Sequence, residues 1–270
     1  MLAGWRSWVN PPRPAYPEPV TDPRARRGIR IELVVVFAVT LGLSGLRSLL
    51  SLLDSLLQPA PLSKQSVALN TPQARADLID LAFQLAFVLQ LLAWGALGLY
   101  LLWNAGIRLA AIGLNGDRKA RDALAGCVLA AIVGVPGLLL YLAARALDLN
   151  LTVLPTTLND VWWRLPVLFL EAVGNAWAEE TLVIGFLLTR ARQLGWSENR
   201  GLVSAAVLRG SYHLYQGFGG GVGNLAMGLL FGRYWQRSNR LWPLIVAHTI
   251  LDTVSFLGYA LLHNHVSWLP

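Results

Sequence analysis

Charge and cysteine are both scarce in this sequence. Only 14% of the 270 residues are charged, whereas 55% are hydrophobic and the mean hydropathy is +0.49. This balance is too apolar for an ordinary soluble domain of this length, and it predicts a polytopic integral membrane protein. Cys127 is the only cysteine, which excludes an intrachain disulfide, a CxxC redox pair and a cysteine-based zinc site. The sequence also contains no P-loop, dinucleotide-binding or HExxH pattern.

Acidic residues are the minority among the charged ones, with 15 Asp and Glu against 22 Lys and Arg and a formal net charge of +7. A basic balance can indicate nucleic-acid binding. Here, however, the basic residues stand in short clusters between apolar runs, as the positive-inside rule describes for the loops of membrane proteins. The expected partner is therefore membrane lipid, and nucleic acid is not expected.

The sequence predicts three parts. Residues 1–30 contain six prolines and six arginines but little apolar surface, which predicts a disordered cytoplasmic tail. Residues 31–147 are expected to form N-terminal transmembrane helices. Residues 161–262 are expected to form a membrane core of the kind that carries catalysis, because the ionisable residues described below lie there.

The expected fold is all-α, a transmembrane helix bundle with about seven spans, the first of which is long enough to cross the hydrocarbon core. The apolar runs place these helices at residues 31–57, 78–103, 123–147, 161–189, 200–215, 222–235 and 241–262. Lys and Arg gather in alternate loops, so the N-terminus is expected in the cytoplasm and the C-terminus outside. This predicts a multi-pass protein of the cell membrane.

Ionisable side chains interrupt the apolar sequence between residues 177 and 252. They are Glu179, Glu180, His213, His248 and Asp252. A charge near the bilayer centre costs a few kcal/mol, roughly 2.5–3.5 on insertion scales, so such residues usually face the interior of a bundle and mark a function. These five residues are therefore the candidate active site.

The spacing of these residues suggests separate roles. Glu179 and Glu180 are adjacent, so on a helix they project about 100° apart, and one can react while the other supports it. His248 and Asp252 are four residues apart and share one helical face, where the carboxylate can orient the imidazole or a bound water. His213 comes from another helix. A pocket between these helices would hold a carboxylate beside a histidine, as water activation requires.

Two other interpretations of this cluster stay open. The polar side chains can simply satisfy one another as contacts between membrane helices. Glu179, His213 and His248 can also be zinc ligands, although the sequence lacks HExxH, which favours a site without metal. No cofactor is otherwise implied, and zinc remains the alternative.

Three segments resemble the motifs of a known protease family in order and approximate spacing. They are AEETLVIGFLLTR, LRGSYHLYQG and LWPLIVAHTILD. The family is the CPBP family of intramembrane proteases, also called the Abi or CAAX-protease and bacteriocin-processing family, and the resemblance covers about residues 163–259. It implies that Glu179 and His213 activate a water molecule. It also implies that His248 and the residue at position 252 stabilise the oxyanion of the cleaved amide.

The sequence departs from the family motifs at three positions. Ile184 stands where the family has arginine, Arg209 where it has phenylalanine, and Asp252 where it usually has asparagine. Arg209 lies one helical turn before His213, and we expect its guanidinium to pair with a motif glutamate in place of the missing arginine. Alternatively, Arg209 extends to the membrane interface or balances Asp252. Without this compensation, the chain is an inactive relative.

The sequence therefore favours an intramembrane endopeptidase acting on a membrane-embedded or membrane-proximal peptide through Glu- and His-activated water. The alternative from another class is a non-catalytic membrane scaffold or a small transporter that relays ions or protons through the same buried charges. A relay tolerates a path made of carboxylates alone, whereas the protease needs Glu179 and His213 in one pocket.

Overall fold

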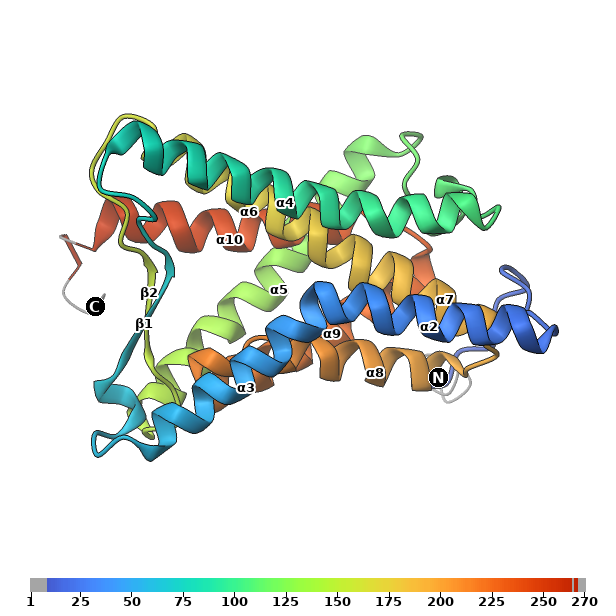
Figure 1. Ribbon diagram of the computed structural model, residues 1–270, viewed down its shortest axis with the longest axis horizontal. Helices are drawn as coiled ribbons and strands as arrows, with labels where there is room; N and C mark the ends of the chain where they lie inside the picture. Colours follow the sequence, from blue (N-terminus) through green and yellow to red (C-terminus); the bar gives the residue numbers. More distant parts are fainter. Residues whose placement is uncertain (1–8, 264, 267–270) are drawn as a thin grey trace.

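The computed structural model describes residues 9–263, 265 and 266, and this part of the chain is mostly helical (Figure 1). Its α-helices are α2 (Pro23–Val39), α3 (Leu41–Leu57), α4 (Asp77–Asn104), α5 (Lys119–Ala146), α6 (Arg164–Glu179), α7 (Leu187–Gln193), α8 (Glu198–Ser211), α9 (Phe218–Ser238) and α10 (Trp242–Leu262). A π-helical turn, Glu180–Phe186, joins α6 to α7. Short 3₁₀ turns lie at Leu62–Lys64, Leu109–Ile112 and Leu214–Gln216, and two strands lie at β1 (Ser66–Asn70) and β2 (Thr152–Thr156).

Helix α2 begins within the segment that was expected to be a disordered tail. The Asp22 carboxylate accepts a hydrogen bond from the Ala25 backbone N–H at 2.8 Å, and Pro23 occupies the first helical position, where its fixed φ suits a helix. Before the helix, the Val20 N–H donates to the Gln193 carbonyl at 2.9 Å. The prediction of disorder up to residue 30 is therefore wrong for this stretch, because backbone contacts that composition does not reveal hold it. Residues 1–8 lie outside the described residues.

Three helices are long and apolar enough to cross a membrane, namely α4, α5 and α10. The pair α2–α3 bends by 50° around Thr40 and adds a fourth candidate if it counts as one broken span. The structure thus agrees with a helical, multi-pass membrane protein. The number seven and the orientation across the bilayer remain predictions.

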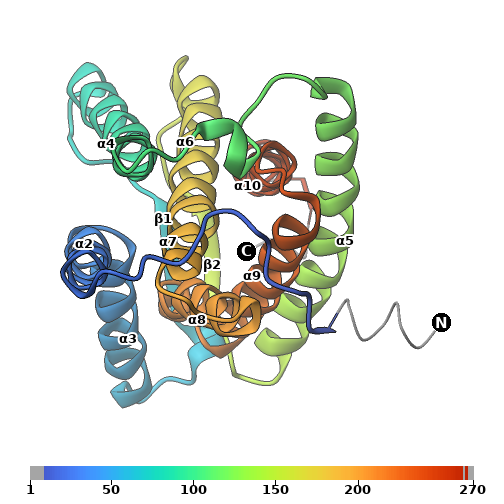
Figure 2. The ribbon, with the colours of Figure 1, turned by 90° about the vertical axis from the view of Figure 1, so that its right-hand side faces the viewer.

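The other helices enclose the polar interior. Every residue of the π-helical turn and of α7 is buried, charged ones included. Figure 2, viewed along the long axis, shows the segment from α6 to α7 in the middle, with α2, α3 and α4 on one side and α5, α9 and α10 on the other. Helix α10 packs against α5 and α6, α4 packs against α6, and α8 packs against α9. Within the segment from α6 to α9, Glu180, Arg190, Arg192 and Arg209 are charged residues whose side chains are buried.

A two-stranded parallel sheet crosses one end of the bundle (Figure 1). In its register Ser66 lies opposite Thr152 and Asn70 opposite Thr156. The segment that enters β2 also pairs with the turn before α9, because the Leu151 N–H donates to the Gln216 carbonyl at 2.9 Å. Gly217 follows with a φ of +110°, and a Cβ at this position would lie 2.7 Å from the Asn150 Cα, so glycine is needed here. These contacts fix the turn that follows His213.

Candidate active site

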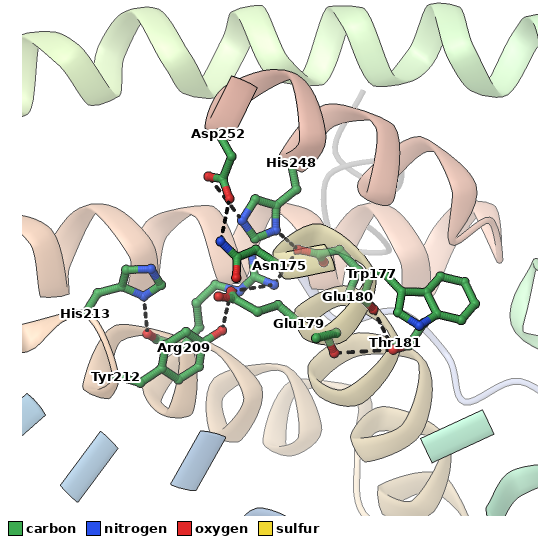
Figure 3. A network of polar contacts seen from close by, with 11 residues as sticks. Asn175, Trp177, Glu179, Glu180, Thr181, Arg209, Tyr212, His213, His248 and Asp252 are labelled. Carbon is green, nitrogen blue, oxygen red and sulfur yellow. Dashed lines mark hydrogen bonds and ion pairs between the residues drawn. The ribbon is translucent and has the colours of Figure 1, made fainter. Parts of the chain in front are cut away.

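The predicted site residues gather where α6, the end of α8 and the middle of α10 meet (Figure 3). Glu179 is the last residue of α6, and Glu180 begins the π-helical turn. A π-helical turn has i→i+5 hydrogen bonds in place of i→i+4, so the side chains around it project in other directions than on a regular α-helix. Such turns occur often at functional sites. The two glutamates here have different hydrogen-bond partners, Tyr212 for Glu179, and Arg209 and His248 for Glu180.

Glu180 and Arg209 form a buried ion pair. The Arg209 Nη2 lies 2.5 Å from the Glu180 Oε1, and both side chains have an exposed fraction of 0%. The same nitrogen lies 3.9 Å from the Glu179 Oε2. The contact predicted between Arg209 and a motif glutamate is therefore present. A pair this deeply buried is strongly destabilising to break, because the remaining partner keeps an uncompensated charge.

His248 lies between two carboxylates. Its Nδ1 is 2.8 Å from the Glu180 Oε1, and its Nε2 is 3.6 Å from the Asp252 Oδ1, which is the i,i+4 pairing that the sequence predicted. The Asn175 amide donates to the other oxygen of Asp252 at 3.4 Å. Because an ionised carboxylate only accepts hydrogen bonds, we assign the proton of the Glu180 contact to Nδ1.

His213 faces the site from the turn after α8. Its Nδ1 lies 3.1 Å from the Arg209 backbone carbonyl oxygen. A carbonyl oxygen only accepts, so Nδ1 carries the proton and donates it. In the neutral imidazole the other nitrogen, Nε2, then has a free lone pair. Figure 3 shows that nitrogen on the side of the ring away from the carbonyl.

Glu179 is anchored by a residue that sequence reasoning missed. The Tyr212 hydroxyl donates to the Glu179 Oε2 at 2.7 Å, and Tyr212 is 6% exposed. The Glu179 side chain itself is 13% exposed, so it is the more accessible of the two glutamates. The signal for Tyr212 was its position beside His213, since a buried tyrosine hydroxyl needs a polar partner. Asn175 was also missed, although it lies one turn before Glu179 on the same helix.

One hydrogen bond joins this part of α6 to α4, and a second lies within the segment formed by α6 and the π-helical turn. The Trp177 indole N–H donates to the Leu92 carbonyl at 3.1 Å, and the Thr181 hydroxyl donates to the Trp177 carbonyl at 2.6 Å. Gly95 of α4 lies under this indole, and a Cβ there would be 2.3 Å from the indole nitrogen. The close approach of α4 to α6 at Gly95 and Trp177 thus lies next to the start of the π-helical turn.

The residues do not fit the alternative of a zinc site. Within residues 9–263, 265 and 266, no three His, Cys, Asp or Glu side chains are placed so that they could hold a metal ion. Glu179, His213 and His248, the predicted alternative ligands, are instead engaged with Tyr212, the Arg209 carbonyl and Glu180. The site is built from hydrogen bonds and ion pairs between protein groups.

A comparison with protein families supports the resemblance described for the motifs. Residues 161–254 match the family model described as "Type II CAAX prenyl endopeptidase Rce1-like". These residues belong to this family. The Rce1-like region includes all six predicted site residues and runs from just before α6 into α10. Membership implies a peptidase, a hydrolase of peptide bonds. No curated protein and no solved structure matches the chain.

Proposed function

We propose that the protein is an intramembrane endopeptidase in which Glu179 and His213 activate a water molecule for attack on a peptide bond. The observation that carries this proposal is the arrangement of the two groups. Glu179 is partly exposed and held by Tyr212, while the Nδ1 contact of His213 leaves its Nε2 as an acceptor. A positioned carboxylate can take a proton from a water nucleophile, and a neutral imidazole can accept a hydrogen bond from the same water.

Glu179 acts as the general base. It takes a proton from the water as the water oxygen bonds to the carbonyl carbon of the peptide. The same carboxyl group then returns the proton to the amine that leaves. His213 accepts a hydrogen bond from the water through Nε2 and thereby orients it. A positioned acid or base of this kind contributes about 10²- to 10⁴-fold in rate.

His248 stabilises the oxyanion of the tetrahedral intermediate. The Glu180 carboxylate holds its Nδ1–H, and in the protonated ring Nε2–H is a second donor. An ionised Asp252 cannot donate to an oxyanion, but its distance of 3.6 Å from Nε2 lets it orient the ring and balance its charge. Position 252 therefore acts through His248 in this proposal. A donor placed where negative charge develops is worth about 10²- to 10³-fold in kcat.

Arg209 replaces the arginine that the family motif carries at position 184. Its ion pair with Glu180 compensates the negative charge of a carboxylate that is shielded from water. Glu180 can then hold His248 without leaving an unpaired charge inside the bundle. The buried pair supports the geometry of the site and does not itself contact the reacting atoms.

The test uses purified protein in vesicles and a prenylated peptide, which the description of the matched family makes the first substrate to examine. Glu179→Gln and His213→Ala should each lower cleavage by about 10²- to 10⁴-fold. The matched control is Glu18→Gln, which makes the same change at an exposed position and should cleave like the parent. Cleavage at the parent rate by both site variants would show that the reaction occurs elsewhere or through other residues.

A further inference from the structure

Tyr212 lies beside the catalytic pair, between Arg209 and His213 in the second motif segment, but it is not one of the residues that the family motif specifies. It caps the C-terminal end of α8, and its ring centroid lies 4.7 Å from that of His213. Its hydroxyl donates to the Glu179 Oε2 at 2.7 Å. Figure 3 shows the phenol reaching from below the site toward Glu179, on the side where Arg209 also lies. One side chain thus contacts both groups that are proposed to activate water.

The two oxygens of Glu179 are not equivalent. Oε2 accepts from Tyr212 and lies 3.9 Å from the Arg209 Nη2. Oε1 has no hydrogen bond from any residue that the structure describes. A donor and a nearby positive charge stabilise negative charge on the oxygen that they face. Oε1 is therefore the oxygen left to meet a water molecule.

We propose that Tyr212 is a positioning residue that fixes Glu179 so that Oε1 takes the proton from the nucleophilic water. This inference rests on the proposed function. As the water O–H bond breaks, its proton moves to Oε1, the water oxygen bonds to the peptide carbon, and the C=O electron pair moves onto the carbonyl oxygen. When this pair returns, the C–N bond breaks and the amine takes the proton from Glu179. Tyr212 keeps its own proton throughout.

The test compares Tyr212→Phe with the parent in the peptide cleavage assay. Phenylalanine keeps the aromatic ring beside His213 and removes only the hydroxyl. A hydrogen bond to a charged group is worth about a 10- to 100-fold effect, so kcat should fall by that factor. KM should stay at the parent value, because the hydroxyl contacts Glu179 and not the peptide. The acid limb of the kcat profile should move to higher pH, since the lost bond favoured the ionised carboxylate.

Tyr215→Phe is the matched control. This tyrosine lies three residues later, and its hydroxyl accepts from the Gln216 amide at 3.0 Å and does not bond to Glu179. Its removal should leave kcat and the pH profile at parent values. A purely structural loss in Tyr212→Phe would lower the amount of folded enzyme without moving the acid limb. That result would overturn the proposal.

A second replacement covers the case in which Tyr212→Phe does not fold. Replacing Tyr212 with 3-fluorotyrosine keeps the shape of the side chain and makes the hydroxyl a stronger donor, so the acid limb should move to lower pH. An unchanged profile with this residue would overturn the role of Tyr212. If Glu179→Gln is inactive in the same assay, the proposed function survives that outcome. If Glu179→Gln cleaves like the parent, both proposals are wrong.

Discussion

The Arg209 guanidinium reaches across from α8 to the first residue of the π-helical turn and lies 2.5 Å from the Glu180 carboxylate. Glu180 in turn holds the His248 ring at 2.8 Å. These contacts connect three helical segments through one carboxylate. The position of His248 therefore depends on a charge supplied by the second motif, at a place where the family has an aromatic residue.

We predict that Arg209→Ala destabilises the folded protein more than the loss of a surface pair would, by about 3–5 kcal/mol, because Glu180 stays buried without its partner. Arg209→Ala combined with Glu180→Gln should recover part of this loss, since the uncompensated charge is removed. Reversible unfolding in mixed detergent measures both free energies. A double-mutant cycle with no coupling between positions 180 and 209 would contradict a compensating role.

Asp252 should tolerate asparagine better than an apolar residue of similar size. In Asp252→Asn the amide can still bond to Asn175 and gains an N–H donor for the oxyanion, so cleavage should equal or exceed that of the parent. Asp252→Leu removes the group that orients the His248 Nε2, and kcat should fall by about 10²-fold, near the low end for loss of an oxyanion donor. Steady-state cleavage at saturating peptide measures both changes. Equal loss in the two variants would mean that a negative charge at this position is itself required.

Much of this site was predictable from the cost of burying charge. Glu179, Glu180, His213, His248 and Asp252 stood out because an apolar helix carries such groups only for a reason. The pairing of Arg209 with a motif glutamate followed from the family resemblance, because Ile184 stands where the motif has arginine. One partner of Glu180, Arg209, was therefore predictable, whereas its contact with His248 was not.

Other features depend on contacts that the sequence pattern does not reveal. The π-helical turn has no marker in its residues, and its packing against α4, α8 and α9 cannot be read from the sequence pattern. The hydroxyl of Tyr212 has a meaning only once Glu179 is placed beside it. Strand β2 contains Pro155 and lies between the helices predicted at residues 123–147 and 161–189, and its pairing with β1 joins residues far apart in the chain.

The orientation across the membrane is a separate prediction, and the single cysteine makes it simple to test. In a Cys127→Ala background, a cysteine at Lys64 or Asp160 should react with an impermeant maleimide in intact cells. Both positions are exposed and lie at the end of the bundle that carries β1 and β2. A cysteine at the exposed Arg237 should react only after the membrane is opened, since basic loops stay in the cytoplasm. The reverse labelling pattern would mean that the protein has the opposite orientation across the membrane.

Asp117 lies outside the membrane helices, and we predict that it makes the stability of the folded protein depend on pH. Arg240 Nη1 donates to the Asp117 Oδ1 at 2.8 Å, and this hydrogen bond lowers the pKa of the Asp117 carboxyl below its ordinary value. The ionised Asp117 carboxyl therefore stabilises the folded protein. This stabilisation is fully present above a pH of about 3.9, the ordinary pKa of the carboxyl in the unfolded chain, and it is lost as the pH falls through the lower pKa of the carboxyl in the folded protein. Asp117→Asn should unfold more easily than the parent at neutral pH, and the difference should vanish in acid. Asp54→Asn makes the same change at an exposed site on α3 and controls for the loss of one negative charge.

The sharpest test of Arg209 moves its charge to the family position. Ile184 is buried in the π-helical turn with an exposed fraction of 0%, so Ile184→Arg alone adds a second buried charge and should destabilise the fold. Arg209→Phe alone leaves Glu180 uncompensated and should lose both stability and cleavage. The combined variant has a single guanidinium, and it carries the family residues arginine at position 184 and phenylalanine at position 209. It should be more stable and more active than either single variant, as measured by unfolding and by peptide cleavage on the same samples. If the combined variant is no better than Arg209→Phe, the two positions are not alternative sources of one charge, and Arg209 is part of an arrangement specific to this chain.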